Sequence, residues 1–158
     1  MSKSGEATRE VFDAVEIVLR GLDGQQELLE ILKQLAESQG PLIEAGEHDS
    51  LLELVRRRQG LVDKLEQTRA GMTNELEVVR KNAGSLDADV REGIRNRVSR
   101  VQELVNKIAE MDMEDAQRLS KSQAACRDQL EHMTSATTAR KSYQQSTTTD
   151  SRFADARG

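Results

Sequence analysis

A heptad pattern over residues 51–79 is the feature that most constrains the fold of this chain. Large side chains recur there with strict 4-3 spacing, which places them along one face of an α-helix. The members of this face are Leu51, Val55, Arg58, Val62, Leu65, Arg69, Met72, Leu76 and Val79. The two arginines can lay their aliphatic stems along the face and reach acidic partners at its edge. We expect a helix over about residues 51–83, packed against an acidic neighbour.

Residues 8–45 form the segment that supplies this neighbour. Its apolar face consists of Val15, Val18, Leu22, Leu29, Leu32, Ala36 and Ile43. Residues 5–48 contain ten acidic and three basic side chains, whereas residues 51–100 contain eight acidic and eleven basic ones. These opposite charges favour antiparallel packing of the two helices, although exposed ion pairs contribute little stability. Gly21 and Gly40-Pro41 predict two weak points in the first helix.

A turn separates each pair of predicted helices. Residues 46–50 form the first loop, and Ser50 with Glu53 matches a capping box at the start of the second helix. Gly84 and Ser85 provide the second turn, after which Ser85 or Asp87 can cap a third helix.

The third helix is expected over about residues 87–140, and its apolar face weakens along its length. The first part of this face contains Ile94, Val98, Val101, Val105, Ile108, Asp112 and Ala116, with one 4-4 step through Asp112 that predicts a stutter. The distal part contains Leu119, Gln123, Cys126, Leu130, Met133 and Thr137. Because this helix is longer than the second, we expect its distal face to meet the first helix, another copy of the chain, or a binding partner.

The composition agrees with an all-α fold. Only 2% of the 158 residues are aromatic, and no apolar run approaches the roughly 20 residues that span a bilayer. We therefore predict an elongated antiparallel three-helix bundle or coiled coil over residues 1–140. Residues 141–158, rich in Ser, Thr and Gln, are predicted to form a disordered polar tail. Two of the three aromatic residues, Tyr143 and Phe153, lie in this tail, which makes them candidate contact residues.

Composition and motifs argue against several function classes. A net charge of -5 disfavours nucleic-acid binding. The single cysteine, Cys126, and the absence of an apolar leader at the N-terminus favour the cytoplasm. No metal-binding, phosphate-binding or catalytic motif occurs, so neither a cofactor nor an enzymatic activity is expected. A histidine phosphotransfer domain is a weaker alternative, because His48 and His132 lack the surroundings typical of such a site.

The order of these segments resembles the FlgN family of flagellar type III export chaperones. The resemblance rests on the stretch Glu44 to Val55, which reads EAGEHDSLLELV, followed by Arg56-Arg57-Arg58-Gln59 and by Leu61 to Leu65. The chain length, the three-helix layout and the polar C-terminal segment are also similar to that family.

This resemblance implies a function and a set of partners. FlgN-like chaperones bind the terminal helical segments of the hook-filament junction proteins FlgK and FlgL, and they deliver these clients to the export gate protein FlhA. The client site lies in the C-terminal helical part of the chaperone. A tyrosine near the C-terminus helps docking to the gate, and Tyr143 is the only tyrosine of this chain.

Two functions therefore remain open from the sequence. In the first, a cytoplasmic chaperone binds client helices through Leu119, Gln123, Cys126, Leu130, Met133 and Thr137, with Tyr143 near the gate. In the second, the same face joins two copies of a coiled-coil scaffold or adaptor. The oligomeric state, monomer or homodimer, distinguishes them.

Overall fold

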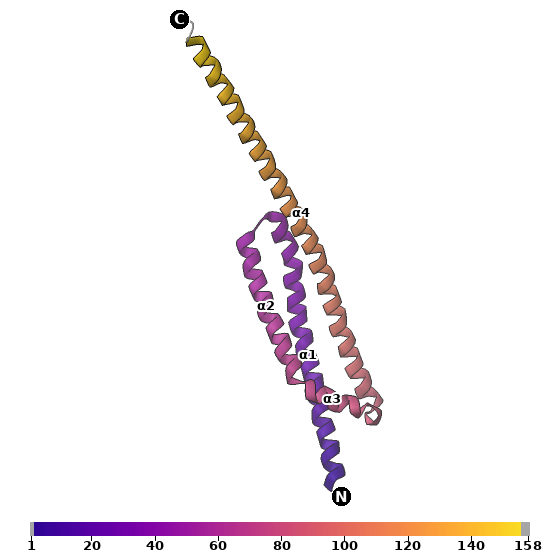
Figure 1. The fold of residues 1–158 in the computed structure, drawn as a ribbon. Coiled ribbons are helices and arrows are strands. Elements are labelled where there is room, and N and C mark those ends of the chain that lie inside the picture. Colours follow the sequence, from indigo (N-terminus) through magenta and orange to yellow (C-terminus); the bar gives the residue numbers. More distant parts are fainter. Residues whose placement is uncertain (1, 156–158) are drawn as a thin grey trace. The chain divides into compact units, whose positions relative to one another are not determined.

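The computed structural model describes the backbone of residues 2–155 and the side chains of residues 3–145. The described chain contains helices α1 (Ser2–Ala45), α2 (His48–Gly71), α3 (Thr73–Lys81) and α4 (Ala88–Asp155), with a short 3-10 helix η1 (Ala83–Ser85) before α4 (Figure 1). It divides into two units, one up to Ala116 and the other from Gln117 onward, so that α4 belongs to both. The predicted all-α fold is confirmed.

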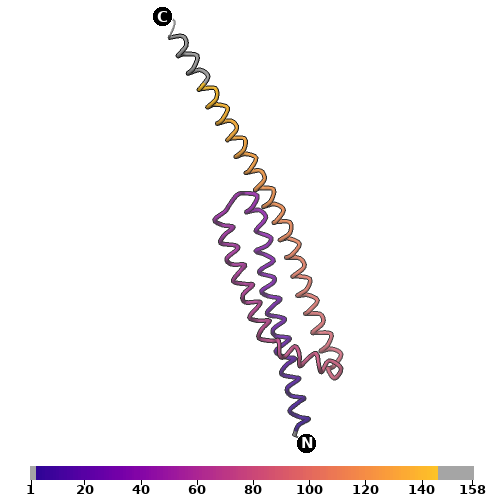
Figure 2. The backbone as a smooth tube through the Cα atoms, in the orientation of Figure 1, coloured from indigo at the N-terminus to yellow at the C-terminus, as the bar shows by residue number. Residues whose placement is uncertain are grey.

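The first unit is a bundle of three long helices (Figure 2). In one core cluster, Met72 at the end of α2 packs with Val18 and Leu22 near the start of α1, so these two helices are antiparallel. In the other cluster, Leu29 and Leu32 of α1 pack with Leu104 and Ile108 of α4. Ion pairs join Asp23 to Arg97 and Glu30 to Arg100, and because the residue numbers rise together, α1 and α4 are parallel.

The apolar face predicted for α1 is confirmed at every position. All seven residues are buried: Val15, Val18, Leu22, Leu29, Leu32, Ala36 and Ile43. Neither expected weak point interrupts the helix, which continues through Gly21 and through Pro41. The Pro41 side chain is exposed, and Ile43 after it returns to the core, which holds the last turn in place.

Helix α1 ends in a Schellman motif at Gly46. The Gly46 amide donates to the Ile43 carbonyl at 3.2 Å, and the Glu47 amide donates to the Leu42 carbonyl at 3.0 Å. Gly46 has a φ of +69°, a left-handed conformation that favours glycine because it carries no Cβ. Helix α2 then begins at His48, so Ser50 lies inside the helix and the predicted capping box at Ser50 and Glu53 is wrong.

The helix predicted over residues 51–83 is divided in two at Met72. Its side chain is only 3% exposed and belongs to the core cluster around Val18 and Leu22. A Cβ atom built on Gly21 would lie 2.6 Å from the Met72 Sδ atom. The glycine in α1 therefore leaves the space that the methionine fills where α2 gives way to α3.

The buried face of α2 differs from the predicted one at every second position. Its buried and half-buried residues are Leu51, Leu54, Arg58, Leu61, Leu65, Thr68 and Met72, whereas Val55, Val62 and Arg69 are exposed. Both sets have 3-4 spacing and share four positions. The four shared positions form a line along the helix, and apolar residues stand on both sides of this line. The periodicity alone therefore does not determine which side faces the core.

The same shift occurs in the first part of α4. Its buried and half-buried positions include Ile94, Arg97, Val101, Leu104, Ile108, Met111 and Asp115, while Val98 and Val105 are exposed. This series alternates 3-4 without interruption. The stutter predicted at Asp112 is therefore absent, because the series of buried and half-buried positions continues through Met111 and Asp115 instead.

The predicted polar tail begins at residue 141, within the residues that α4 spans. The described backbone of α4 extends to Asp155, and the described side chains from Lys141 to Gln145 are all exposed. Residues 94–155 contain neither glycine nor proline, the two residue types that most disfavour a helix interior. Residues 156–158 and the side chain of Phe153 lie outside the described part.

Candidate functional site

The residues predicted to bind a partner all lie in the second unit, on α4. We call Leu119, Gln123, Cys126, Leu130, Met133 and Thr137 the C-terminal stripe. Successive members are three or four residues apart, so a helix places them on one face within about 40° of a common centre line. The structure therefore brings the six together as one continuous surface.

The C-terminal stripe is exposed along its whole length. The side chains of Leu130 and Met133 are 64% and 67% exposed, and Leu119, Gln123, Cys126 and Thr137 are exposed as well. The described part of the second unit is this single helix, which offers no second element to cover the stripe. Exposed apolar residues at helical spacing are typical of a surface that receives another amphipathic helix.

The threonines around the stripe are less polar than their residue type suggests. The Thr137 hydroxyl donates to the Met133 carbonyl at 2.9 Å, and the Thr134 hydroxyl donates to the Leu130 carbonyl at 2.8 Å. Because each hydroxyl has a partner within its own helix, covering it with an apolar surface costs less than covering an unpaired hydroxyl.

Tyr143 lies on α4 but not on the stripe. At about 100° per residue, its position is about 120° around the helix from the centre line of the stripe. Its side chain is 74% exposed. The seven predicted residues thus belong to two faces, and a partner on the stripe leaves the face of Tyr143 open to a different contact.

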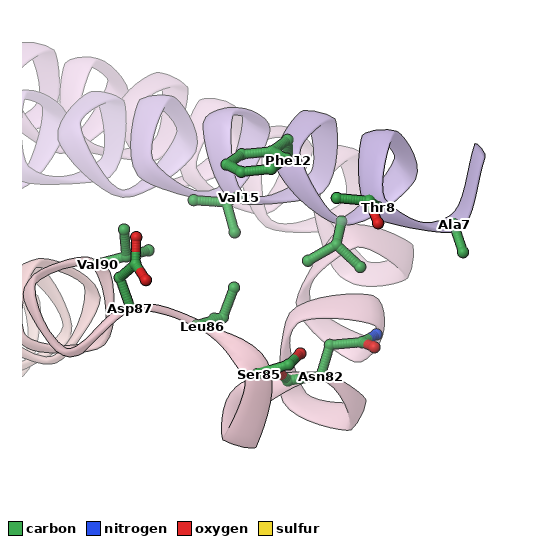
Figure 3. A pocket seen from close by; sticks show the side chains of 10 residues that line it. Ala7, Thr8, Phe12, Val15, Asn82, Ser85, Leu86, Asp87 and Val90 are labelled. Atoms are coloured by element: carbon green, nitrogen blue, oxygen red, sulfur yellow. The ribbon is translucent and has the colours of Figure 1, made fainter. Parts of the chain in front are cut away.

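The first unit has an apolar cavity that the sequence analysis did not identify. It has a volume of about 310 Å³ and lies between the start of α1 and the turn that leads into α4 (Figure 3). Val11, Phe12 and Val15 line one side, and Leu86 and Val90 line the other. Phe12 is the residue from which this cavity could have been predicted, because this aromatic side chain stands beside the apolar face of α1 rather than on it.

The described side chains do not form a metal-binding cluster. They contain no group of three or more His, Cys, Asp or Glu residues placed to hold an ion. Cys126 is a free, exposed thiol, and His48 and His132 are also exposed.

The ion pairs of the first unit differ from the expected ones. Arg58 of α2 pairs with Asp112 of α4 rather than with an acidic residue of α1. The acidic residues Asp23 and Glu30 of α1 pair with Arg97 and Arg100 of α4. The hydrogen bond to Glu30 raises the pKa of Arg100 further above its ordinary value. These two ion pairs of opposite charge therefore join α1 to α4, which is parallel to it.

The fold and the exposed stripe define an all-α helical-bundle protein with an open amphipathic face. No helix in the described residues is long and apolar enough to cross a membrane. The FlgN protein family model matches residues 14–151, and the chain belongs to the FlgN family. No curated protein and no solved structure matches the sequence.

Membership of this family identifies the general role of the chain. FlgN proteins are flagellar export chaperones and not enzymes, and the match extends from α1 to the C-terminal part of α4. The predicted family and the chaperone role in flagellar export are thereby confirmed.

Proposed function

We propose that this chaperone captures a terminal helix of a hook-filament junction protein of the FlgK or FlgL type on the C-terminal stripe. The observation that carries the proposal is the exposure of Leu119, Cys126, Leu130 and Met133 on one face of α4. A client helix laid along this face would bury these side chains and its own apolar face together. Such capture keeps the client from assembling before export and requires no nucleotide.

The same proposal includes delivery in the cytoplasm to an export gate protein of the FlhA type. Tyr143 supports this step, because an exposed aromatic residue on a different face from the stripe can contact the gate while the client remains bound. The proposal also treats residues 1–140 as one folded domain that presents this surface.

A direct binding experiment tests the capture step. Leu130→Glu combined with Met133→Glu places two charges on the stripe, so we expect the affinity for the terminal helix of the junction protein to fall at least tenfold. His132→Glu is the matched control, since it introduces the same residue in the same turn, about 140° from the centre line of the stripe. Circular dichroism of each variant verifies that the helix content is retained. Undiminished binding by the double variant would refute capture on the stripe.

The alternative function, a self-associating scaffold, uses the same exposed face. Sedimentation of the unmodified chain distinguishes the two functions. A monomer whose stripe binds a client supports the chaperone mechanism. A stable homodimer that the Leu130→Glu, Met133→Glu variant dissociates would favour the scaffold.

A further inference from the structure

The charges around the C-terminal stripe are unevenly distributed. Residues 117–145 contain five basic and two acidic side chains, namely Arg118, Lys121, Arg127, Arg140, Lys141, Asp128 and Glu131. At about 100° per residue, Arg127, Arg140 and Lys141 lie about 80°, 60° and 40° from the centre line of the stripe, and Arg118 lies about 100° from it. Asp128 and Glu131 lie about 180° and 120° away. Within about 80° of the centre line every charged side chain is therefore basic, whereas the two acidic residues lie at about 120° or more.

The basic residues stand on both borders of the stripe. Lys141 and Arg127 lie on one side of the centre line, and Arg140 lies on the other, all three with exposed side chains. A helix laid on the stripe would bring its own flanking residues next to them, as the residues beside the seam do in a coiled coil. Acidic residues at those positions form ion pairs, whereas basic ones repel.

We infer that the helix bound by the C-terminal stripe is an amphipathic helix with acidic residues on both borders of its apolar face. This inference rests on the proposed function and specifies the chemistry of the client. From Leu119 to Lys141 the surface is about 33 Å long at 1.5 Å per residue, so it accommodates a helix of about six turns.

The charge pattern also argues against a second copy of this chain as the occupant. Pairing two C-terminal stripes would place basic borders against basic borders, which is destabilising. The acidic helix α1 of a second copy cannot cover the C-terminal stripe either. Its apolar residues Val18, Leu22 and Leu29 are already buried in its own bundle.

A membrane surface is a poorer occupant than an acidic helix. Basic amphipathic helices can bind anionic lipid, but they need a substantial apolar face to insert. The stripe offers three large apolar side chains, Leu119, Leu130 and Met133, separated by Gln123 and Cys126.

Two synthetic peptides of equal length test the inference with the full chain. They share one apolar face of leucines, and glutamates border this face in one peptide while lysines border it in the other. We expect the glutamate-bordered peptide to bind at least tenfold more tightly at about 0.05 M salt. The difference should shrink towards zero at 1 M salt, where the Debye length is about 3 Å.

Lys141 and Lys121 form a matched pair of positions in the chaperone. Both are exposed lysines of α4, and neither has an acidic residue three or four positions away. Lys141 borders the stripe, whereas Lys121 lies about 160° from its centre line. Lys141→Glu should weaken binding of the glutamate-bordered peptide about three- to tenfold, and Lys121→Glu should change it less than twofold.

The outcomes separate this inference from the proposed function. If both peptides bind equally, or if the two lysine variants behave alike, the acidic-border inference is wrong. The loss of junction-protein binding in the Leu130→Glu, Met133→Glu variant would still support the proposed function in that case. Stronger binding to vesicles containing 30% anionic lipid than to the glutamate-bordered peptide, or salt-dependent dimerisation through the stripe, would also overturn the inference.

Discussion

Arg58 and Asp112 form a bidentate ion pair that joins α2 to α4. The Nη1 and Nη2 atoms of Arg58 donate to the Oδ1 and Oδ2 atoms of Asp112, each at 2.7 Å. The same Arg58 also donates to the Gln39 Oε1 atom of α1 at 2.6 Å. One half-buried side chain therefore contacts all three long helices of the bundle, with only 16% of it exposed.

Removal of the carboxylate at Asp112 should destabilise the protein more than the loss of an ordinary surface charge. Asp112→Ala leaves the Arg58 charge without its carboxylate partner, so we expect a loss of about 1.5–3 kcal/mol in the free energy of unfolding. Glu16→Ala, which removes an exposed ion pair with Arg20 within α1, should cost less than about 0.5 kcal/mol. Urea unfolding measures both variants, and equal losses would contradict a special role for the Arg58 pair.

Two glycines of α1 should respond in opposite ways to alanine. Gly24 has open space where a Cβ would lie, so Gly24→Ala should stabilise the protein by up to about 1 kcal/mol through helix propensity. At Gly21 the added Cβ would collide with the Met72 side chain. Gly21→Ala should therefore destabilise the protein by about 1–3 kcal/mol. If chemical denaturation shows that both variants gain stability, Met72 has room to move and the close approach is not a constraint.

The left-handed turn at Gly46 predicts a specific order of substitutions. Gly46→Ala should cost about 1–2 kcal/mol, because an L-residue is strained at a φ of +69°. Gly46→Asn should cost less, since asparagine tolerates this conformation better. Gly60→Ala serves as the control within α2, where open space surrounds the Cβ position. Thermal unfolding followed by circular dichroism would reveal the order, and an alanine variant as stable as the asparagine variant would contradict it.

The placement of Tyr143 predicts that client capture and gate docking are separable. Tyr143→Ala should weaken binding to the gate protein about tenfold, as loss of an exposed aromatic anchor does at many interfaces. Binding of the junction-protein helix should change less than twofold, because Tyr143 lies on another face of α4. Calorimetric titrations with each partner measure the two effects. A parallel loss of both affinities would place the tyrosine within the client site.

All seven residues of the apolar face predicted for α1 are buried, whereas the prediction for α2 contains only four of the seven positions that are buried or half-buried there. In α1 the half-buried Leu28, Leu35 and Leu42 widen the predicted face on one side, and the predicted residues themselves remain buried. In α2, Leu54 and Val55 stand on opposite sides of the shared line through Leu51 and Arg58, and Leu61 and Val62 repeat the ambiguity. The choice between them depends on where α1 and α4 lie, which is information that no local pattern contains.

The ion-pair partners and the division at Met72 were unpredictable for a related reason. Charge totals indicated that α1 needs basic partners, but they do not specify which of the two neighbouring helices supplies them. Met72 continues the heptad spacing of residues 51–79, so periodicity gave no sign of a break there. The exposure of the C-terminal stripe could be predicted more directly, because its six members stand three or four residues apart in a part of α4 that has no companion helix among the described residues of its unit.

Every buried side chain among residues 3–145 lies between Ala14 and Asp115. The buried core of the described residues therefore lies entirely within the first unit. A substitution along the C-terminal stripe can alter affinity for a partner without weakening the bundle. Mutational drift can change which partner this helix recognises while the protein remains folded throughout.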